Sequence, residues 1–268
     1  MNRAVEIAHR EGALTAASLM VGAPAAADAV KTARRLPGLG VGLHLALVDA
    51  APVLPAAAVP DLVDDRGRFR PNMALSGAVM FLQPSVRGQM IAEVRAQFEA
   101  FRATGLKLDH VTAHRHFHLH PSITSAILGL KAEFGVRAVR APFEPRSVLS
   151  RIEGGAPRIA AAALEPLARL QRRRLKSAGI MAPDQVFGLA WSGAMTASRL
   201  AGLIAHLPDG VTEIYAHPAT ASGFAGSAPG YRYPEELAAL TSPEVRSLIA
   251  STGIASGGFA GAINFRRQ

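Results

Sequence analysis

Short apolar segments alternate with amphipathic segments along most of this chain of 268 residues, and this alternation limits the folds it can adopt. Five segments have the apolar composition of buried strands, at residues 15–21, 40–48, 136–142, 185–190 and 211–217. Strands that alternate with helices predict a parallel sheet, because each parallel connection needs a crossover segment. No internal repeat or linker divides the chain. We therefore expect one α/β domain over residues 1–268.

Apolar residues recur at helical spacing between the predicted strands. Helices are expected at residues 2–11, 25–36, 86–104, 122–134, 157–178, 196–207, 234–240 and 243–251. The stretch 49–84 is rich in Pro, Ala and Asp and is predicted as a long loop. Long loops in compact domains are often functional, so this one either borders a substrate cleft or only caps the sheet.

The overall composition is that of a folded protein with a sizeable core. Hydrophobic residues make up 49% of the chain and charged residues 18%, and no run approaches the roughly 20 apolar residues that span a bilayer. The N-terminal residues lack the apolar region of a secretory signal. The absence of cysteine excludes disulfides and thiolate-bound zinc. These features predict a cytoplasmic protein.

The net charge of +9 is partly local. Residues 167–179 hold Arg169, Arg172, Arg173, Arg174 and Lys176. One interpretation is a solvated helix face, and the other is a patch for an acidic partner. Aromatic residues do not interleave with the basic ones, which argues against nucleic acid. Apolar residues (Ile159–Leu164, Leu167, Leu170) accompany the basic ones, so peripheral contact with the inner face of a membrane stays open.

The segment LDHVTAHRHFHLHP (Leu108–Pro121) holds five of the nine histidines. They occupy alternate positions, and in an extended chain this period of two places them on one face. A face of imidazoles is a poor core, because each buried ring needs hydrogen-bond partners. It would be a good wall for a polar cleft that holds a metal ion. A metal-storing tract is the alternative interpretation.

Three histidines fall at or near the carboxyl ends of predicted strands, namely His44, His114 and His217. In parallel α/β folds the active site lies where these strand ends meet the following loops. One such histidine is usually a hydrogen-bonded structural residue. Three in one sheet favour a functional site.

Four segments together resemble one known family: LDHVTAHRHFHLHP, VGLHLAL, VRAVRAPFEP and TEIYAHPAT. These segments are similar to the motifs of the YdjC-like carbohydrate deacetylases, and they follow one another along the chain in the order found in that family. The similarity is greatest to the branch associated with hopanoid biosynthesis. The resemblance covers nearly the whole chain. It implies a (β/α)-barrel-like fold related to the NodB-like barrel of polysaccharide deacetylases. It also implies hydrolysis of an N-acetyl group from an amino sugar.

The resemblance also implies a divalent metal held by one aspartate and two histidines, which match His44 and His114 here. Magnesium is favoured by the resemblance, while zinc and manganese also suit such ligands. We expect His217 to act as general acid toward the leaving amine. Arg140 would orient a carboxylate or contact the substrate, unless it forms only a surface salt bridge. His116 and His118 would fix the tautomers of the ligands or meet the substrate.

The chain departs from the family at its start. Family members open with a strand ending in Ala-Asp-Asp-Phe-Gly, which supplies the metal-binding aspartate, whereas residues 1–12 resemble the helix that follows that motif. Asp64 and Asp65 lie in a turn after His44, and Asp109 does not match the missing position. We expect either a start assigned too far downstream or a truncated, metal-binding pseudoenzyme.

The expected substrate is an N-acetylglucosaminyl lipid, a glycosylated hopanoid, because the hopanoid-type resemblance and the basic, apolar segment agree with a membrane-borne substrate. Soluble chito-oligosaccharides and another metal-dependent amidohydrolase reaction are the alternatives. No G-x-S-x-G motif occurs, and the chain has no cysteine nucleophile. The sequence is compatible with a homodimer but does not fix the oligomeric state.

Overall fold

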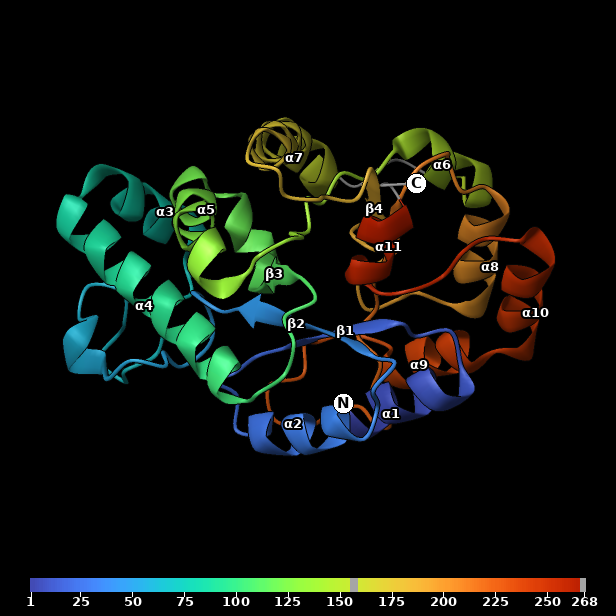
Figure 1. The fold of residues 1–268 in the computed structure, drawn as a ribbon, viewed down its shortest axis with the longest axis horizontal. Coiled ribbons are helices and arrows are strands. Elements are labelled where there is room, and N and C mark those ends of the chain that lie inside the picture. Colours follow the sequence, from blue (N-terminus) through green and yellow to red (C-terminus); the bar gives the residue numbers. More distant parts are fainter. Residues whose placement is uncertain (155–158, 266–268) are drawn as a thin grey trace.

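The structure is a computed structural model that describes residues 1–154 and 159–265, with side chains over 164–264 in the second range. Helices surround two parallel sheets (Figure 1). The predicted helix start near Pro157 and the side chains of residues 159–163 lie outside the described part. The strands are β1 (Ala16–Leu19), β2 (Gly40–Leu45), β3 (Val111–Ala113), β4 (Gln185–Phe187) and β5 (Thr212–Ile214).

The first sheet has the order β1-β2-β3, and the second pairs β4 with β5. All these pairs are parallel, as the sequence predicts, with Ala16 opposite Gly40 and His44 opposite Thr112. The predicted strand at 136–142 takes part only through isolated bridges, from Val139 to β3 and from Ala138 to Met181. Within the described residues, β1 and β5 each have one edge without a strand partner.

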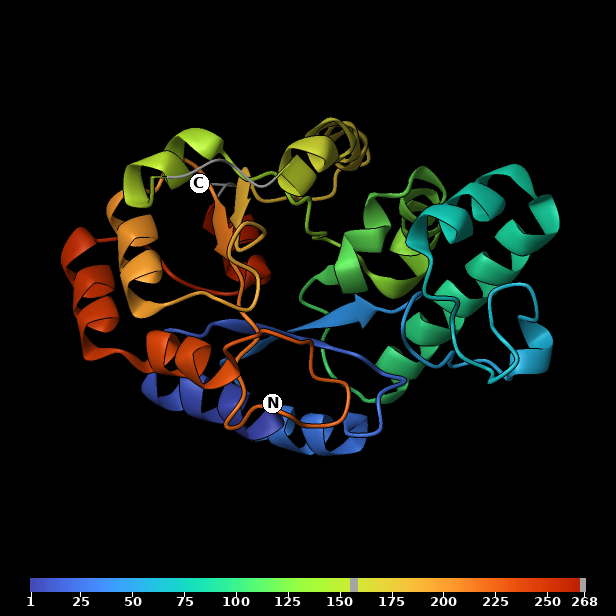
Figure 2. The same cartoon turned by 180° about the vertical axis from the view of Figure 1, so that it is seen from behind.

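The helices lie outside the sheets in both views (Figures 1 and 2). They are α1 (Asn2–Glu11), α2 (Ala26–Arg34), α3 (Met73–Leu82), α4 (Pro84–Ala103), α5 (Pro121–Phe134), α6 (Arg146–Ile152), α7 (Ile159–Ser177), α8 (Ala197–Ala205), α9 (Tyr233–Thr241), α10 (Pro243–Thr252) and α11 (Phe259–Phe265). Two short 3-10 helices are η1 (Ala56–Ala58) and η2 (His114–Leu119). Within the described residues, none of the helices combines the length and apolar character needed to cross a bilayer.

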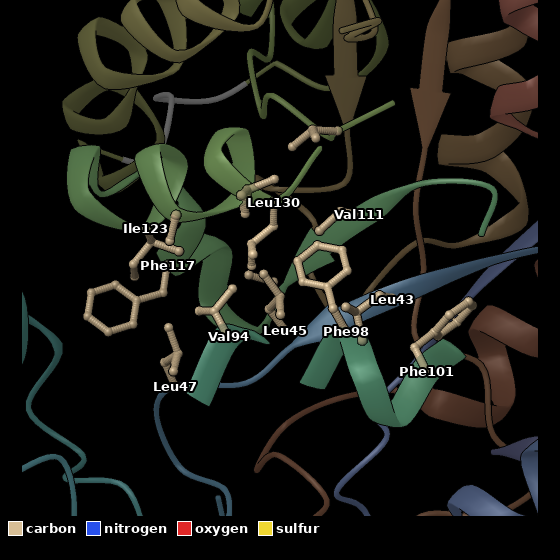
Figure 3. Close-up of a cluster of buried hydrophobic side chains, with 14 of the residues drawn as sticks. Leu43, Leu45, Leu47, Val94, Phe98, Phe101, Val111, Phe117, Ile123 and Leu130 are labelled. Carbon is tan, nitrogen blue, oxygen red and sulfur yellow. The ribbon is translucent and has the colours of Figure 1, made fainter. Parts of the chain in front are cut away.

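The main core lies between the first sheet and helices α4 and α5 (Figure 3). Leucines of β2 and Val111 of β3 pack there against Phe98 and Phe101 of α4 and Ile123 of α5. A second cluster lies under α8 and α9 and includes Phe187. Burial of apolar surface stabilises a fold by roughly 25 cal/mol per Å². These two clusters therefore stabilise the strands whose ends carry the site.

The predicted loop at 49–84 contains η1 and α3, which the sequence analysis missed. The α3 segment MALSGAVMFL is apolar on nearly every face, so it shows no helical period. Its start is fixed by Asn72, whose side chain accepts a hydrogen bond from the Leu75 amide. Helices α6 and α11 were also not predicted, and at seven residues each they are too short for a clear period.

Candidate active site

The histidine segment is not extended beyond Ala113, so the prediction of histidines on one strand face is wrong after that residue. Strand β3 ends at Ala113 and η2 begins at His114. Arg115 and His116 adopt left-handed backbone conformations, with φ of 50° and 56°. Two such residues in succession turn the chain, which places His114, His116 and His118 in different surroundings.

His44 and His114 lie next to each other, as the strand-end argument predicts. Their ring centroids are 6.0 Å apart in an edge-on arrangement. The Nδ1 atom of His44 lies 2.7 Å from the hydroxyl of Thr112, its neighbour on β3. Burial, with a further contribution from nearby His114 and Arg140, lowers the pKa of His44 well below its usual value.

His114 contacts the loop that follows β2. Its Nε2 is 4.0 Å from Oδ2 of Asp49, which also lies 2.7 Å from Nε of Arg115. Burial lowers the pKa of His114, and the charge of Asp49 opposes this shift. Both His44 and His114 are thus neutral near pH 7, the form in which imidazole binds a metal.

Arg140 is buried and forms an ion pair with Glu213 of β5, which excludes the surface salt bridge left open by the sequence. Its Nε lies 2.9 Å and 3.0 Å from the two carboxylate oxygens of Glu213. Its guanidinium also covers the ring of Tyr215 at 4.5 Å. Burial lowers the pKa of Arg140, but the Glu213 carboxylate more than offsets this, so the pKa is raised and the charge is retained.

His116 and His118 bond to groups other than the two ligand candidates. Nε2 of His116 is 3.0 Å from the Tyr215 hydroxyl, and Nε2 of His118 is 2.7 Å from the Arg140 carbonyl oxygen. The hydrogen-bond partner that orients His44 is instead Thr112. Burial lowers the pKa of His118 to about 4 and that of His116 well below its usual value.

His217 follows β5 and packs between two tyrosine rings, with centroids 5.6 Å from Tyr215 and 5.2 Å from Tyr231. Its backbone amide donates to the buried carboxylate of Glu236. Burial, aided by the charge of Arg140, lowers the pKa of His217 to about 4. The ring is therefore neutral at pH 7 in the resting site.

The donor chemistry of the site suits a divalent metal only in part. The Nδ1 atoms of His116, His118 and His217 are buried without a hydrogen-bond partner, so three polar atoms are left unsatisfied beside the site. His44 and His114 have the character of metal ligands. However, nowhere in residues 1–154 and 159–265 do three His, Asp or Glu side chains form a group that could hold a metal. Among the described residues, His44 and His114 therefore lie together without a third candidate ligand beside them.

Several residues of the site were missed by the sequence analysis. Glu213 and Tyr215 alternate with His217 along VTEIYAH, so the same period of two could have assigned them to the side that carries His217. Glu236 orders the chain at His217 and accepts a second amide, that of Met195. Glu144 accepts three consecutive amides at residues 188–190. Such long-range anchoring leaves no local sequence pattern.

The fold and the site define a candidate hydrolase site at the carboxyl ends of parallel strands. The family model described as "YdjC-like protein" matches residues 1–251. The chain belongs to the YdjC-like family.

Proteins named carbohydrate deacetylase are among its relatives. The one from Geobacillus stearothermophilus is 30% identical over 95% of this chain and 89% of that protein. The human one is 30% identical over 91% of this chain and 80% of that protein. The one from Brevibacillus brevis is 41% identical, but the match spans only 53% of this chain and 54% of that relative.

A solved structure shares the fold. It is a protein from Enterococcus faecalis V583 named for cellobiose-phosphate cleavage, and it superposes with a TM-score of 0.72. The superposition covers 97% of this chain and 92% of that protein, at 21% identity. This similarity confirms the predicted α/β fold and agrees with a NodB-like barrel.

Proposed function

We propose that this protein is a carbohydrate N-deacetylase, a hydrolase that releases acetate from an acetamido sugar. The observation that carries the proposal is the convergence of His44, His114, Arg140 and His217 at the carboxyl ends of parallel strands. His114, Arg140 and His217 each lower the pKa of His44, and the His114 ring also lies beside the His44 ring. Shifted titratable groups that meet in this way are typical of active sites. The names of the relatives support the same reaction.

In this reaction water adds to the acetyl carbon, the C–N bond breaks, and the amine nitrogen gains a proton. We assign that proton transfer to His217. Because its ring is neutral in the resting site, it must first receive the proton from the attacking water before it passes the proton to the nitrogen. Burial raises the pKa of Tyr215, which keeps its hydroxyl protonated and bonded to His116.

His44 and His114 would hold the divalent ion, with magnesium favoured and zinc or manganese as alternatives. When bound, such an ion polarises an acyl oxygen and lowers the pKa of water. The third ligand would be an aspartate on a further strand, as in the Ala-Asp-Asp-Phe-Gly motif of the family. The partnerless edges of β1 and β5 support this position, because each edge offers backbone groups for pairing.

We propose a lipid-linked N-acetylglucosaminyl substrate, a glycosylated hopanoid, with peripheral contact at the inner face of a membrane. Helix α7 supports this contact, since Leu167 (39% exposed) and Leu170 (46% exposed) lie beside Arg173 and Lys176. A surface hollow of about 310 Å³ lies along the same basic residues. A soluble chito-oligosaccharide is the competing substrate.

The first experiment measures acetate release by the purified protein, with and without added Mg²⁺, Mn²⁺ or Zn²⁺. The substrates are an N-acetylglucosaminyl lipid in vesicles and a chito-oligosaccharide. We expect metal-dependent release, faster from the lipid, and background release from His44→Ala. His206→Ala is the matched control, because His206 is exposed and its ring bonds only to a carbonyl oxygen of its own helix. Full release by His44→Ala would contradict the assignment.

A metal-binding pseudoenzyme is the second candidate, favoured by the incomplete ligand set among the described residues. Fusing a strand with the Ala-Asp-Asp-Phe-Gly motif before Met1 separates the two. The deacetylase proposal expects the fusion to raise metal affinity and acetate release, and the same fusion with both aspartates changed to asparagine to do neither. Metal binding without acetate release in every form would favour the pseudoenzyme.

A further inference from the structure

We propose that Asp109, His110, Ser18 and Thr112 form a hydrogen-bond network that fixes the ring proton of His44 on Nδ1 and leaves its Nε2 lone pair available. These four residues, with His44, are called the His44 network below. The inference rests on the proposed function, in which His44 is a metal ligand. It adds positioning residues to that site.

The network runs across all three strands of the first sheet. Nδ1 of His44 on β2 is 2.7 Å from Oγ1 of Thr112 on β3. The Thr112 hydroxyl donates to Oγ of Ser18 on β1 at 2.9 Å. Ser18 Oγ is 2.9 Å from Nε2 of His110, whose Nδ1 is 2.9 Å from Oδ2 of Asp109. The far end of the network thus lies before the first residue of β3, and the near end reaches the site.

The direction of each hydrogen bond follows from the number of protons. The Asp109 carboxylate accepts from the backbone amides of Phe259 and Ala260, so His110 must donate to it from Nδ1. With its single ring proton on Nδ1, His110 accepts at Nε2. The Ser18 hydroxyl donates this hydrogen bond. Thr112 spends its only proton on Ser18, so its oxygen must accept from Nδ1 of His44.

Asp109 is suited to be the fixed acceptor at the far end. Burial raises its pKa, but the hydrogen bonds from His110 and from the two amides of α11 outweigh burial, and the pKa is lowered. The carboxylate is therefore charged at neutral pH and accepts hydrogen bonds without donating one.

The backbone is shaped around this end of the network. A side chain at Gly42 would lie within 2.5 Å of the His110 ring, and one at Gly40 within 2.8 Å of the Asp109 carboxylate. The ring of Phe259 stacks on His110, with centroids 4.2 Å apart. The two glycines of GVGLHL in β2, Gly40 and Gly42, therefore make room for the network that orients the histidine of the same strand.

A purely structural role would hold the three strands together without fixing a tautomer, so the test must read the tautomer itself. The method is two-bond ¹H–¹⁵N correlation NMR on protein labelled with ¹⁵N-histidine, at pH 7.5 after treatment with a chelator. We expect His44 to carry its proton on Nδ1. Free imidazole side chains favour Nε2–H, so the expected signal is distinctive.

Thr112→Val removes the acceptor, and we expect the His44 proton to move toward Nε2, while Thr112→Ser restores the wild-type signal. Thr124→Val is the matched control, because Thr124 is equally buried and its hydroxyl bonds to the His118 carbonyl oxygen outside the network. It should leave the His44 tautomer unchanged. In acetate release, Thr112→Val should lower kcat by about 10–100-fold with little change in KM.

Wild-type His44 with its proton on Nε2 would overturn the proposal, as would an unchanged tautomer in a folded Thr112→Val protein. Urea unfolding of each variant identifies any that fail to fold, and the tautomer of wild-type His44 then carries the test. The NMR measurement needs neither metal nor substrate. A protein with the expected tautomer but no acetate release would therefore count against the deacetylase and not against the His44 network.

Discussion

Strands β2 and β5 each lead to a histidine of the site, and they hold it in different ways. β2 lies between two strands, and His44 sits within it with Nδ1 bonded to Thr112. β5 ends its sheet, and His217 lies three residues after the strand with Nδ1 unpartnered. The backbone of His217 is anchored through Glu236, and its ring is held by packing against Tyr215 and Tyr231.

This difference matches two chemical tasks. A metal ligand must present one lone pair in one direction, so its ring benefits from a fixed tautomer. A group that carries a proton must accept it at one moment and release it at another, so an unpartnered ring nitrogen is useful. The comparison predicts that substitutions around β5 lower the stability of that sheet and impair proton transfer by His217. Substitutions around β2 should instead change the tautomer of His44.

Arg140→Met should have the largest effect, because it removes the buried partner of the Glu213 carboxylate on β5, whose side chain is only 12% exposed. Breaking a buried pair costs about 3–5 kcal/mol of unfolding free energy. Urea unfolding measures this loss, and hydrogen exchange should show lost protection in β4 and β5 before β1–β3. The control is Arg95→Met, whose partner Glu133 is exposed, and it should cost less than about 1 kcal/mol. Equal loss of hydrogen-exchange protection in the two sheets would contradict the inferred difference between the β2 and β5 sides of the site.

Acidification should be the next largest effect, through buried His118. The pKa of His118 is about 4 in the folded protein and about 6.5 when unfolded. Between these values the unfolded state binds the extra proton, so the stabilising contribution is complete above pH 6.5 and is lost as the pH falls toward 4. The loss amounts to about 3 kcal/mol. Unfolding free energies at pH 7 and pH 4.5 should differ less in His118→Gln than in the wild type, and identical differences would refute the assignment.

The sequence predicted the parts of the molecule that follow from local periodicity. The parallel strands and most helices are near their predicted positions, and His44 and His114 are neighbours as their strand ends require. The turn at Arg115 and His116 was not predictable. Alternate histidines favour an extended chain, and neither of the two residues with left-handed backbone is a glycine, the residue that usually marks such a turn. The partners of the site residues were also hidden. Thr112, Glu213 and Glu236 act across strands or loops that only the tertiary fold brings together.

The smallest of the three effects is expected for Glu236→Gln, and it tests the β5 side most directly. The amide keeps the shape of the side chain, but its NH2 group cannot accept, so one of the two bonds from the amides of His217 and Met195 is lost. Hydrogen bonds to a charged group contribute about 1.5–3 kcal/mol, so unfolding free energy should fall by about 2 kcal/mol.

Glu144→Gln is the matched control, because Glu144 also accepts only backbone amides, at residues 188–190. Both variants should lose stability. Glu236→Gln, which acts on the backbone of His217 itself, should lower kcat for acetate release more than Glu144→Gln does. The ¹⁵N signals of His44 should stay unchanged, since β2 and Thr112 hold that ring independently of β5. A changed His44 signal in Glu236→Gln would mean that the two histidines are positioned as one unit, and the division between a fixed ligand and a proton carrier would fail.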